Sequence, residues 1–504
     1  MSGNLSKSPK TIFCLTYHEI TADARVLKEA RALHSAGHNV HIFCDWPGGL
    51  PQEENIDGIR VTRFNWQSSE NISEDTLTRF FFVDRVSSEV ERRVVPYVEE
   101  AAQLNAIKSW LKESLTDEET RMLDPMYYKS YSKSDNARER RKRKFAHKRL
   151  LWKTNFMHGF GKTSGNLKSI GSKNRETREK FRELYQLSSL VFAENICSLK
   201  FDETPDVIHA HDIYCLPAGV LLAKRFKAKL VYDAHEYEPA RATKNPADGS
   251  NFAEKLEDDC LPFVDHMITV SSSIAELYAE RFKDHPTLIL NAPEIDANYM
   301  GSRKKQALDQ LSIRAQAHVD DGTPLVIFTG GIQMGHRGLD KVLQALVHLP
   351  EVRLATMGPR HQKNDSWFMK EARKVGVSDR ITLLPPVAAP DVPVAISTAD
   401  LAICPFQDVS LNHRYAMPNK LFEAAFAGVP ICVSDLPEMR RFAETLGFGR
   451  AMDETDPESI AEAIRDVLDH PENYTMTAEN KKKLWESYSW PAQAEKLARL
   501  YDEI

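Results

Sequence analysis

The chain has 504 residues, a formal net charge of −6 and a sequence pI near 6.3. This length is enough for two or three domains with substantial cores. The slightly acidic balance argues against a dedicated nucleic-acid-binding protein, so no nucleic-acid partner is expected.

Cysteine usage and hydropathy indicate the cellular compartment. None of the seven cysteines forms a C-x-x-C pair, and most lie inside apolar strand-like runs, which is typical of small core residues in a reducing compartment. No apolar run approaches the roughly 18 residues that span a bilayer, and residues 1–7 lack a signal-peptide pattern. We expect a cytoplasmic protein, with peripheral contact at the inner face of the membrane left open. The cysteines are Cys14, Cys44, Cys197, Cys215, Cys260, Cys404 and Cys432.

In the first half of the chain, short apolar runs alternate with helical patterns, which predicts parallel β-α-β units. Gly37 ends the first helix, and Asp23 is its expected N-cap. The predicted elements are strands at 11–17, 39–44, 58–64, 206–209, 229–233, 266–270 and 287–290, and helices at about 23–36, 89–113, 216–225 and 273–281.

The segment from about 116 to 184 differs in character: it is polar and basic, with few β-branched residues. Its most basic part, 138–153, also carries apolar side chains including Trp152. We predict a helical insertion in the first domain whose basic arm contacts an anionic membrane surface or anionic acceptor. A solvated helix face is an equal alternative, and RNA binding is a weaker one.

A second alternating series follows a connection at about 291–321. Together the two series predict two doubly wound, Rossmann-like α/β domains facing a cleft: 1–295 with the insertion, then 296–488, with a C-terminal helix at 489–504. The predicted elements are strands at 325–329, 352–357, 381–384, 399–406 and 429–434, and helices at 339–349, 365–375, 391–398, 418–428 and 491–504.

Residues 418–430 are the most informative segment. Proline opens the helix, glycine closes it, and strands lie on either side. Asn419 and Lys420 fall in the first turn and Glu423 one turn later, so a cation, a carboxylate and unpaired backbone N–H groups surround one helix start. This arrangement suits a ribose carrying a diphosphate. An ordinary surface helix is the alternative.

A glycine-rich loop at 329–338 follows a predicted strand and leads into a helix. Gly330 and Gly331 allow backbone amides to approach an anion, and Arg337 adds a forked cation that suits phosphate. A flexible loop is the alternative, and the pairing with Lys420 and Glu423 favours the functional interpretation.

Histidines follow two strands of the first domain. His209 and His211 end one strand beside Asp212, and His235 and Glu236 follow another. A lone histidine at a strand end is usually structural, but several together with carboxylates indicate a functional polar cluster. Their spacing does not fit an established zinc site, so we expect no catalytic metal and no cofactor.

These motifs, together with a final helix that begins at Trp490, resemble the large retaining GT-B glycosyltransferase family four, also called glycosyl transferases group 1. The resemblance covers both domains and leaves out the basic arm. It implies that the second domain holds a nucleotide-diphosphate sugar and that the C-terminal helix crosses back onto the first domain. It also implies that His211 lies near the donor sugar and that Glu423 binds the ribose.

Two positions depart from the family pattern. Gly331 stands where the family has the arginine of its diphosphate-binding pair, and Tyr415 stands where it has the first glutamate. Arg337 supplies the second cation of the pair, and Lys420 is placed to replace the first. We therefore predict His211, Arg337 and Lys420 as catalytic.

The predicted activity is transfer of a sugar, of hexose type in family terms, to a glycan, lipid-linked or polysaccharide acceptor, with retention and without metal. Acceptor contacts are assigned to Asp23, Arg25, His235 and Glu236, although a local ion pair at the helix start is the alternative for the first two. A catalytically inactive nucleotide-sugar-binding or scaffold protein is the second hypothesis, and a nucleotide-sugar epimerase the third.

Overall fold

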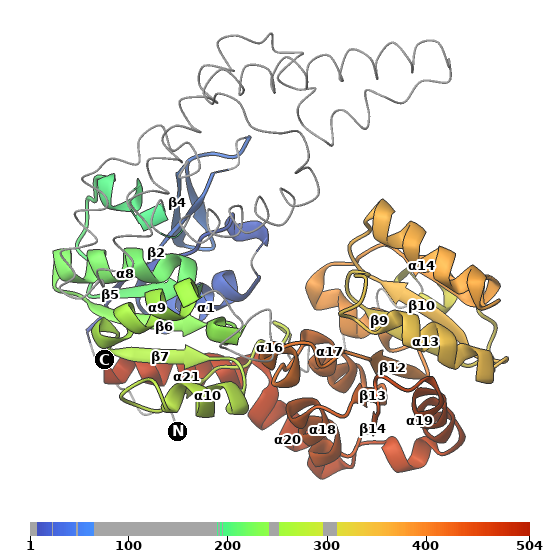
Figure 1. The fold of residues 1–504 in the computed structure, drawn as a ribbon. Helices are drawn as coiled ribbons and strands as arrows, with labels where there is room; N and C mark the ends of the chain where they lie inside the picture. The colour runs from blue at the N-terminus through green and yellow to red at the C-terminus, as the bar shows by residue number, and fades with distance from the viewer. Residues whose placement is uncertain are drawn as a thin grey trace, which may run out of the picture. The chain divides into compact units, whose positions relative to one another are not determined.

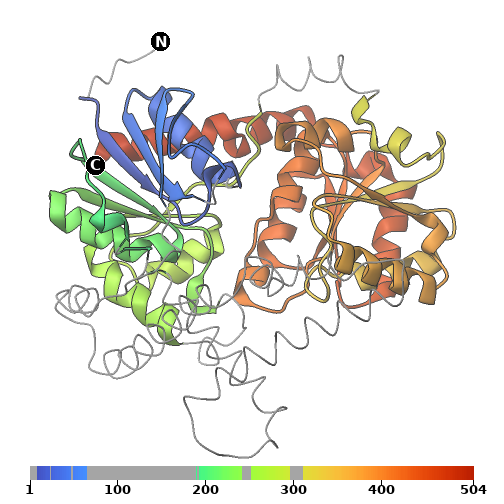
Figure 2. The ribbon, with the colours of Figure 1, turned by 90° about the horizontal axis from the view of Figure 1, so that it is seen from above.

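The computed structural model describes residues 8–22, 24–46, 49–64, 189, 192–193, 195–240, 251–295 and 310–504. The described residues on either side of segment 66–195 belong to one compact unit that contains two β-sheets (Figures 1 and 2). The predicted helix at 89–113, the insertion at 116–184, the basic arm at 138–153 and Asp23 lie outside the described residues.

The first sheet has eight described strands in the order β3-β4-β2-β1-β5-β6-β7-β8, and β3 with β4 is its antiparallel pair. Its buried strands read as apolar runs because helices cover both faces. The chain order reverses between β1 and β5, so their carboxyl ends mark the switch point where ligands of such sheets bind. The strands are β1 (Thr11–Leu15), β2 (Asn39–Asp45), β3 (Glu53–Ile56), β4 (Ile59–Phe64), β5 (Val207–His211), β6 (Lys229–Ala234), β7 (His266–Thr269) and β8 (Thr287–Leu288).

Helices α1 (Ala24–Ser35) and α21 (Trp490–Glu503) pack against each other on the first sheet. Helices α8 (Asp212–Phe226) and α9 (Asn251–Cys260) pack together, and α10 (Ser272–Ala279) contacts β8. Ser271 caps α10 by accepting a hydrogen bond from the backbone N–H of Ile274.

The second sheet has six described strands, all parallel, in the order β11-β10-β9-β12-β13-β14. Its switch point lies between β9 and β12. The strands are β9 (Leu325–Thr329), β10 (Arg353–Met357), β11 (Ile381–Leu384), β12 (Leu401–Cys404), β13 (Ile431–Ser434) and β14 (Gly449–Met452).

Two helical layers cover the second sheet (Figure 1). Helices α13 (Leu339–Ala345), α14 (Gln362–Lys374) and α19 (Pro457–Asp469) share one buried cluster with one face of the sheet. The other face buries α15 (Val392–Ile396), α17 (Asn419–Ala427), α18 (Pro437–Leu446) and α20 (Ala478–Tyr488). Two one-turn helices, α12 (Ile313–Gln316) and α16 (Leu411–Arg414), lie in connecting segments.

The last helix, α21, belongs to the core of the first sheet (Figure 2). Ser489 caps it by accepting from the backbone N–H of Ala492. Its Trp490 and Tyr501 are buried with β1 and α1, and the ammonium of Lys28 lies 4.4 Å from the Trp490 ring centroid. The C-terminal helix therefore joins the second half of the chain to the first sheet.

The structure corrects several element boundaries. The strand predicted to end at His209 continues to His211, because α8 begins at Asp212, whose φ of 59° turns the chain directly into the helix. The strand predicted at 287–290 ends at Leu288, and the helix predicted at 391–398 is α15 preceded by a 3-10 turn at Ala389–Asp391.

Other elements were missed from the sequence. Strand β4 was predicted at 58–64, but its hairpin partner β3 was missed; the hairpin turns at Asp57 and Gly58, both with positive φ, and an Asp-Gly pair between strands is a known hairpin signal. Helix α9 and the stretch from α18 to α20, including β14, were also missed. Prolines at the starts of α18 and α19 marked those two helices.

Candidate functional site

The carboxyl ends of β9 and β12 bring the glycine-rich loop and the start of α17 together. Gly330 follows β9 directly, and Phe406 follows β12. Lys420, in the first turn of α17, points its ammonium at this junction: the Nζ atom lies 4.4 Å from the ring centroid of Phe328 and 4.5 Å from that of Phe406. Two segments about 90 residues apart thus meet at the switch point of the second sheet.

Two cations share the ring of Phe406. The guanidinium carbon of Arg337 lies 4.5 Å from the same ring centroid as the Lys420 ammonium. Within the described part of the chain, neither cation has a carboxylate within ion-pair distance, and Lys420 is only 9% exposed. Burial lowers the pKa of Lys420 to about 8 and also lowers the pKa of Arg337.

The shift of Lys420 measures how unfavourable its position is without an anion. A fall from 10.5 to about 8 corresponds to about 3 kcal/mol against the charged form. An anion beside Lys420 and Arg337 would recover that energy, because both charges would then be paired. The geometry is therefore suited to binding an anion.

The helix start itself contributes backbone donors. Helix α17 begins after Pro418 without a side-chain cap, and Asn419 is exposed at its first position. The unpaired N–H groups and dipole of this nine-residue helix favour an anion at the same place as Lys420.

Glu423 lies one turn into α17. Its Oε2 accepts a 2.6 Å hydrogen bond from the hydroxyl of Thr329, and burial raises its pKa. The Glu423 carboxylate lies beside the cations but is turned toward β9. It is therefore placed to accept hydrogen bonds from hydroxyl groups. The sequence reasoning did not identify Thr329 as its partner, although the residue ends β9 and so points to the same edge.

Two glycines fix the shape of the glycine-rich loop. Gly330 has a φ of 114°, and Gly338, with a φ of 64°, lies so close to β12 that a Cβ there would meet the carbonyl oxygen of Pro405 at 2.0 Å. The close approach at Gly338 places the neighbouring Arg337 over Phe406. Gly331 has no such requirement and lies near the carbonyl of Pro359.

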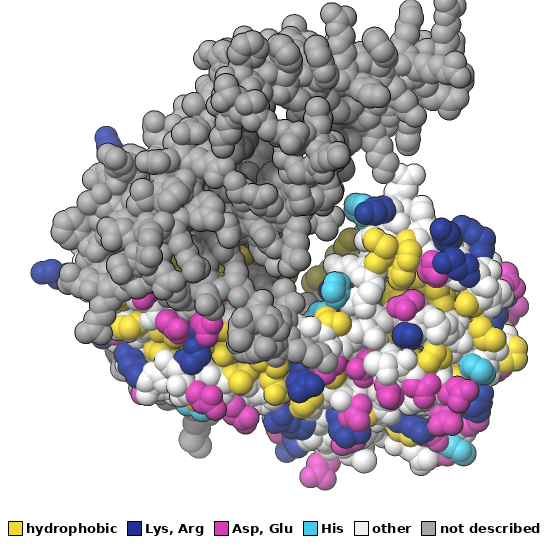
Figure 3. Space-filling view, viewed as in Figure 1, with side chains coloured by type: hydrophobic (Ala, Val, Ile, Leu, Met, Phe, Trp, Pro, Cys, Tyr) yellow, Lys and Arg dark blue, Asp and Glu magenta, His cyan; other side chains and the backbone are white. Residues whose placement is uncertain are grey.

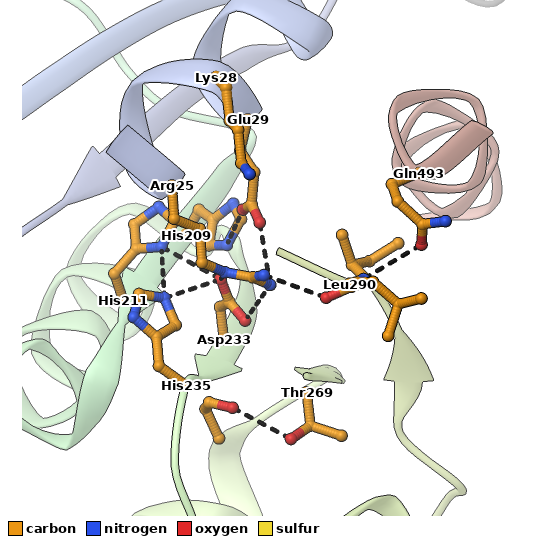
Figure 4. Close-up of polar contacts among 12 residues, drawn as sticks. Arg25, Lys28, Glu29, His209, His211, Asp233, His235, Thr269, Leu290 and Gln493 are labelled. Carbon is orange, nitrogen blue, oxygen red and sulfur yellow. Dashed lines mark hydrogen bonds and ion pairs between the residues drawn. The ribbon is translucent and has the colours of Figure 1, made fainter. Parts of the chain in front are cut away.

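A second polar cluster lies at the carboxyl ends of β5 and β6 in the first sheet (Figure 4). Asp233, fully buried at the end of β6, accepts hydrogen bonds from Arg25, with Nε to Oδ2 at 2.8 Å and NH2 to Oδ1 at 2.9 Å. His211 Nδ1 lies 3.3 Å from Asp233 Oδ2. Burial opposes ionisation of Asp233, but the charges of Arg25 and His235 hold its pKa well below the usual value.

His235 is the second cation of this cluster. Its Nε2 lies 3.0 Å from Asp233 Oδ2, and its Nδ1 lies 3.3 Å from Asp212 Oδ2. Burial alone would lower its pKa, but the two carboxylates raise it well above the usual value. His235 is therefore an imidazolium at neutral pH.

A deeper layer joins the cluster to α1 and α21. Glu29 Oε1 lies 2.9 Å from Arg25 NH2, and its Oε2 lies 3.7 Å from His209 Nε2. Tyr501 of α21 contacts His209 Nδ1 at 2.8 Å. Burial raises the pKa of Glu29 to about 6 and lowers that of His209 well below its usual value, so His209 is neutral.

The described residues contain one four-residue group with the side chains to hold a metal. Potential ligand atoms of Glu29, His209, His211 and Asp233 lie within 4.8 Å of one another. The guanidinium of Arg25, however, already contacts both carboxylates. A cation would repel this buried charge, so we assign the group to an ion-pair network and not to a metal centre.

The structure brings together Gly330, Arg337, Lys420 and Glu423 at one sheet edge and His211 and His235 at the other. Glu236 follows β6 and accepts a 3.3 Å hydrogen bond from the side chain of Asn412. Arg25, predicted as an acceptor contact, is 3% exposed and bonded to protein carboxylates, so its position favours the alternative of an ion pair. Tyr415 is half-buried at the end of α16.

Residues that sequence reasoning left without a role include Glu29, Asp233 and Phe406. Asp233 lies two residues before His235, and Glu29 is one helical turn after Arg25, so the sequence contained a signal for each of these two residues. Phe406 follows an apolar strand, and its role depends on two loops meeting over its ring.

On the face shown in Figure 3, basic and acidic side chains are interspersed over the described surface. No helix among the described residues is both long enough and apolar enough to cross a bilayer. The charges that stand out are those of Lys420, which is buried, and Arg337, which is half-buried, because neither has an ion-pair partner among the described residues.

The fold and this site define a class. Over 98% of both chains, the structure resembles the sucrose-phosphate synthase of Thermosynechococcus elongatus, with a TM-score of 0.60 at 14% identity. It also resembles an alpha,alpha-trehalose-phosphate synthase (UDP-forming) of Burkholderia vietnamiensis, with a TM-score of 0.59 at 9% identity, over 98% of this chain and all of that one. The fold is that of the GT-B glycosyltransferases, with two Rossmann-like domains.

Family comparisons specify the class further. Residues 309–484 match the family described as glycosyl transferases group 1, and residues 172–294 match glycosyltransferase family 4. A D-inositol 3-phosphate glycosyltransferase of Thermobispora bispora is 23% identical over 59% of this chain and 70% of its own length. One from Xylanimonas cellulosilytica is 23% identical over 59% and 71%. The chain belongs to the glycosyl transferases group 1 family and is a glycosyltransferase.

Proposed function

We propose that the chain transfers a sugar, of hexose type, from a nucleotide-diphosphate sugar to an acceptor, and that the second sheet holds the diphosphate. The supporting observation is the pair of Lys420, which is buried, and Arg337, which is half-buried; neither has an ion-pair partner among the described residues, and both lie at the switch point of that sheet. A diphosphate supplies the anion that this pair and the start of α17 favour.

In this mechanism, departure of the diphosphate leaves growing negative charge on its oxygens. Arg337, Lys420, the backbone around Gly330 and Gly331 and the first turn of α17, with Asn419, stabilise that charge as it develops. Protein cations thus do what a metal ion does elsewhere, so we propose that the transfer needs no metal. Glu423 accepts from the ribose hydroxyls.

His211, at the switch point of the first sheet, contacts the donor sugar, and His235 and Glu236 contribute to the acceptor side. By analogy with the family, transfer proceeds with retention of anomeric configuration. We propose a glycan or lipid-linked acceptor in polysaccharide biosynthesis and a cytoplasmic enzyme. The basic arm at 138–153 would contact an anionic membrane surface at its inner face.

The relatives named for D-inositol 3-phosphate suggest one further acceptor to test, because their name specifies a phosphorylated small molecule. It belongs in the acceptor panel beside glycan and lipid-linked acceptors.

The test is incubation of the purified chain with a panel of nucleotide sugars, with each acceptor class, and measurement of released nucleotide diphosphate. Release that depends on acceptor and persists in EDTA supports the proposal. Binding of a nucleotide sugar by calorimetry without release with any acceptor supports the scaffold hypothesis, and an isomerised donor supports an epimerase. The anomeric proton of the product, observed by NMR, reports retention or inversion.

A further inference from the structure

We propose that Asp233 is a positioning residue of the transfer reaction: its carboxylate, held by Arg25, orients the imidazole of His211 so that Nε2 accepts a hydrogen bond from a substrate hydroxyl. The inference rests on the proposed function, because it specifies how the first sheet presents His211. It concerns a residue that does not itself touch the substrate.

The Asp233 carboxylate has little freedom to rotate. Arg25 donates to both of its oxygens through two separate nitrogens, and the same guanidinium donates to the carbonyl of Ile289 at 3.0 Å. A two-point contact of this kind fixes orientation as well as charge. Because Asp233 and Arg25 are 0% and 3% exposed, water does not compete for these bonds.

The fixed carboxylate determines the tautomer of His211. A carboxylate can only accept, so the His211 tautomer with its proton on Nδ1 is the one that can donate to Asp233 Oδ2, which lies 3.3 Å from Nδ1. Its Nε2 then has the lone pair, and this buried atom has no hydrogen-bond partner among the described residues. The ring of His209 stacks on that of His211 at 4.2 Å and fixes its plane.

His235 could in principle compete for His211 Nδ1, since its Nε2 lies 3.4 Å away. The same Nε2 is closer to Asp233 Oδ2, at 3.0 Å, and the carboxylate is charged. The proton of His235 therefore goes to Asp233 and not to His211.

Several titratable groups lie near His235. They are Arg25 and Glu29 on α1, His209 and His211 on β5, Asp212 on α8, Asp233 on β6 and Glu236 after β6. The cationic state of His235 depends on Asp212 and Asp233 together. Removing the Asp233 charge consequently lowers the pKa of His235 and releases the tautomer of His211.

The test is Asp233→Asn, assayed with the nucleotide sugar that the wild-type chain uses. An amide in this place no longer specifies the tautomer, and an Asp→Asn change beside a catalytic imidazole has cost about 10,000-fold in another enzyme class. We expect kcat to fall at least about 100-fold while the donor KM stays within about threefold, because the diphosphate contacts lie on the other sheet. The turnover that remains in Asp233→Asn should decline as the pH rises through about 6 to 8, because His235 loses its proton in this range once the Asp233 charge is removed.

Two further variants separate positioning from folding. Asp265→Asn is the matched control: this aspartate pairs with Lys229 at the amino end of β7, so turnover should not change. Asp233→Asn alone leaves the buried Arg25 with less counter-charge. The double variant Arg25→Met/Asp233→Asn removes both of these charges but leaves Glu29 without Arg25, so it should be more stable than Arg25→Met alone without recovering kcat.

Histidine-selective nitrogen-15 NMR provides a readout that needs no turnover. In the wild-type chain, the His211 ring should show the Nδ1–H form, and His235 should remain protonated well above pH 7; His211→Asn and His235→Asn variants assign the signals. Observation of the Nε2–H form of His211 would overturn the inference. So would a folded Asp233→Asn protein with kcat within about threefold of wild type and an unchanged pH profile. If no nucleotide sugar is turned over, the proposed function fails while the NMR result still decides this point.

Discussion

Within the described residues, buried charges lie at the carboxyl edges of both sheets, but only the first edge pairs its cations with carboxylates. At the first edge, Arg25 and His235 are matched by Asp233, Asp212 and Glu29. At the second edge, Arg337 and Lys420 stack on Phe406 with no carboxylate within ion-pair distance among the described residues. A matched network holds side chains in position, whereas unmatched cations are ready to bind an anion.

Under the proposed function, this contrast separates the residues expected to bind the substrate from those that hold other side chains in position. A buried charge without a partner destabilises the protein, and such positions are typical of functional sites. The first edge keeps its internal pairs, and its histidines range from the fully buried His209 to His235, whose side chain is 17% exposed. The second edge keeps its cations for the ligand.

The largest expected effect comes from removing the unmatched cations. Arg337→Met and Lys420→Met should each lower kcat about 100- to 1000-fold, because each removes one group that stabilises the departing diphosphate. The double variant should lose less than the product of the two effects, since both act on the same anion. Steady-state release of nucleotide diphosphate measures this.

Lys374→Met is the control, because this lysine lies at the far end of α14 and pairs with Glu371 on the surface. Its kinetics should match wild type. Normal turnover by either the Arg337 or the Lys420 variant would show that the diphosphate binds elsewhere.

Stability should respond with opposite signs at the two edges. Arg25→Met leaves Asp233 and Glu29 without their partner and should lower the free energy of unfolding by about 3–5 kcal/mol. Lys420→Met removes an unmatched charge and should raise it by up to about 3 kcal/mol in the ligand-free protein.

Urea unfolding of the ligand-free variants, followed by circular dichroism, measures both changes. If Lys420→Met proves as destabilising as Arg25→Met, the lysine has an internal partner and the contrast between the edges is lost.

The smallest effect is a pH dependence centred on Lys420. Its pKa of about 8 lies below the usual 10.5, so the folded protein binds fewer protons than the unfolded chain between these values. The penalty of the buried charge is fully present below pH 8, and the free energy of unfolding should rise with pH from about 8 to 10.5. Over the same range the donor KM should increase, because the ammonium that binds the diphosphate is lost.

The Lys420→Met variant should show neither the rise in the free energy of unfolding nor the increase in donor KM between about pH 8 and 10.5. A wild-type donor KM that stays constant to pH 10 would mean that Lys420 does not contact the donor.

Much of the fold could be predicted from the sequence because its signals are local. The runs at 325–329 and 381–384 became β9 and β11 with the predicted bounds, and Gly428 ends α17 in the left-handed conformation. The failures were also local in origin. Strand β3 is polar at its exposed positions, and β14 is a short strand with mostly half-buried residues, so neither has a strong apolar run.

The candidate site was predictable in part. Lys420 and Glu423 could be placed at one helix start because the helix period fixes their spacing. The partner of each side chain could not be read in this way. Arg25 was predicted as an acceptor contact, with a local ion pair at the helix start as the alternative, and it is paired with Asp233, 208 residues further along the chain.

The sequence by itself determined the alternation of strands and helices, the glycine positions that require positive φ and the residue types at the strand ends, since each depends on neighbours within a few residues. The tertiary structure alone decided which charges are matched. Pairing depends on the order of strands in each sheet, which brings α1 to β6 at one edge and the glycine-rich loop to α17 at the other.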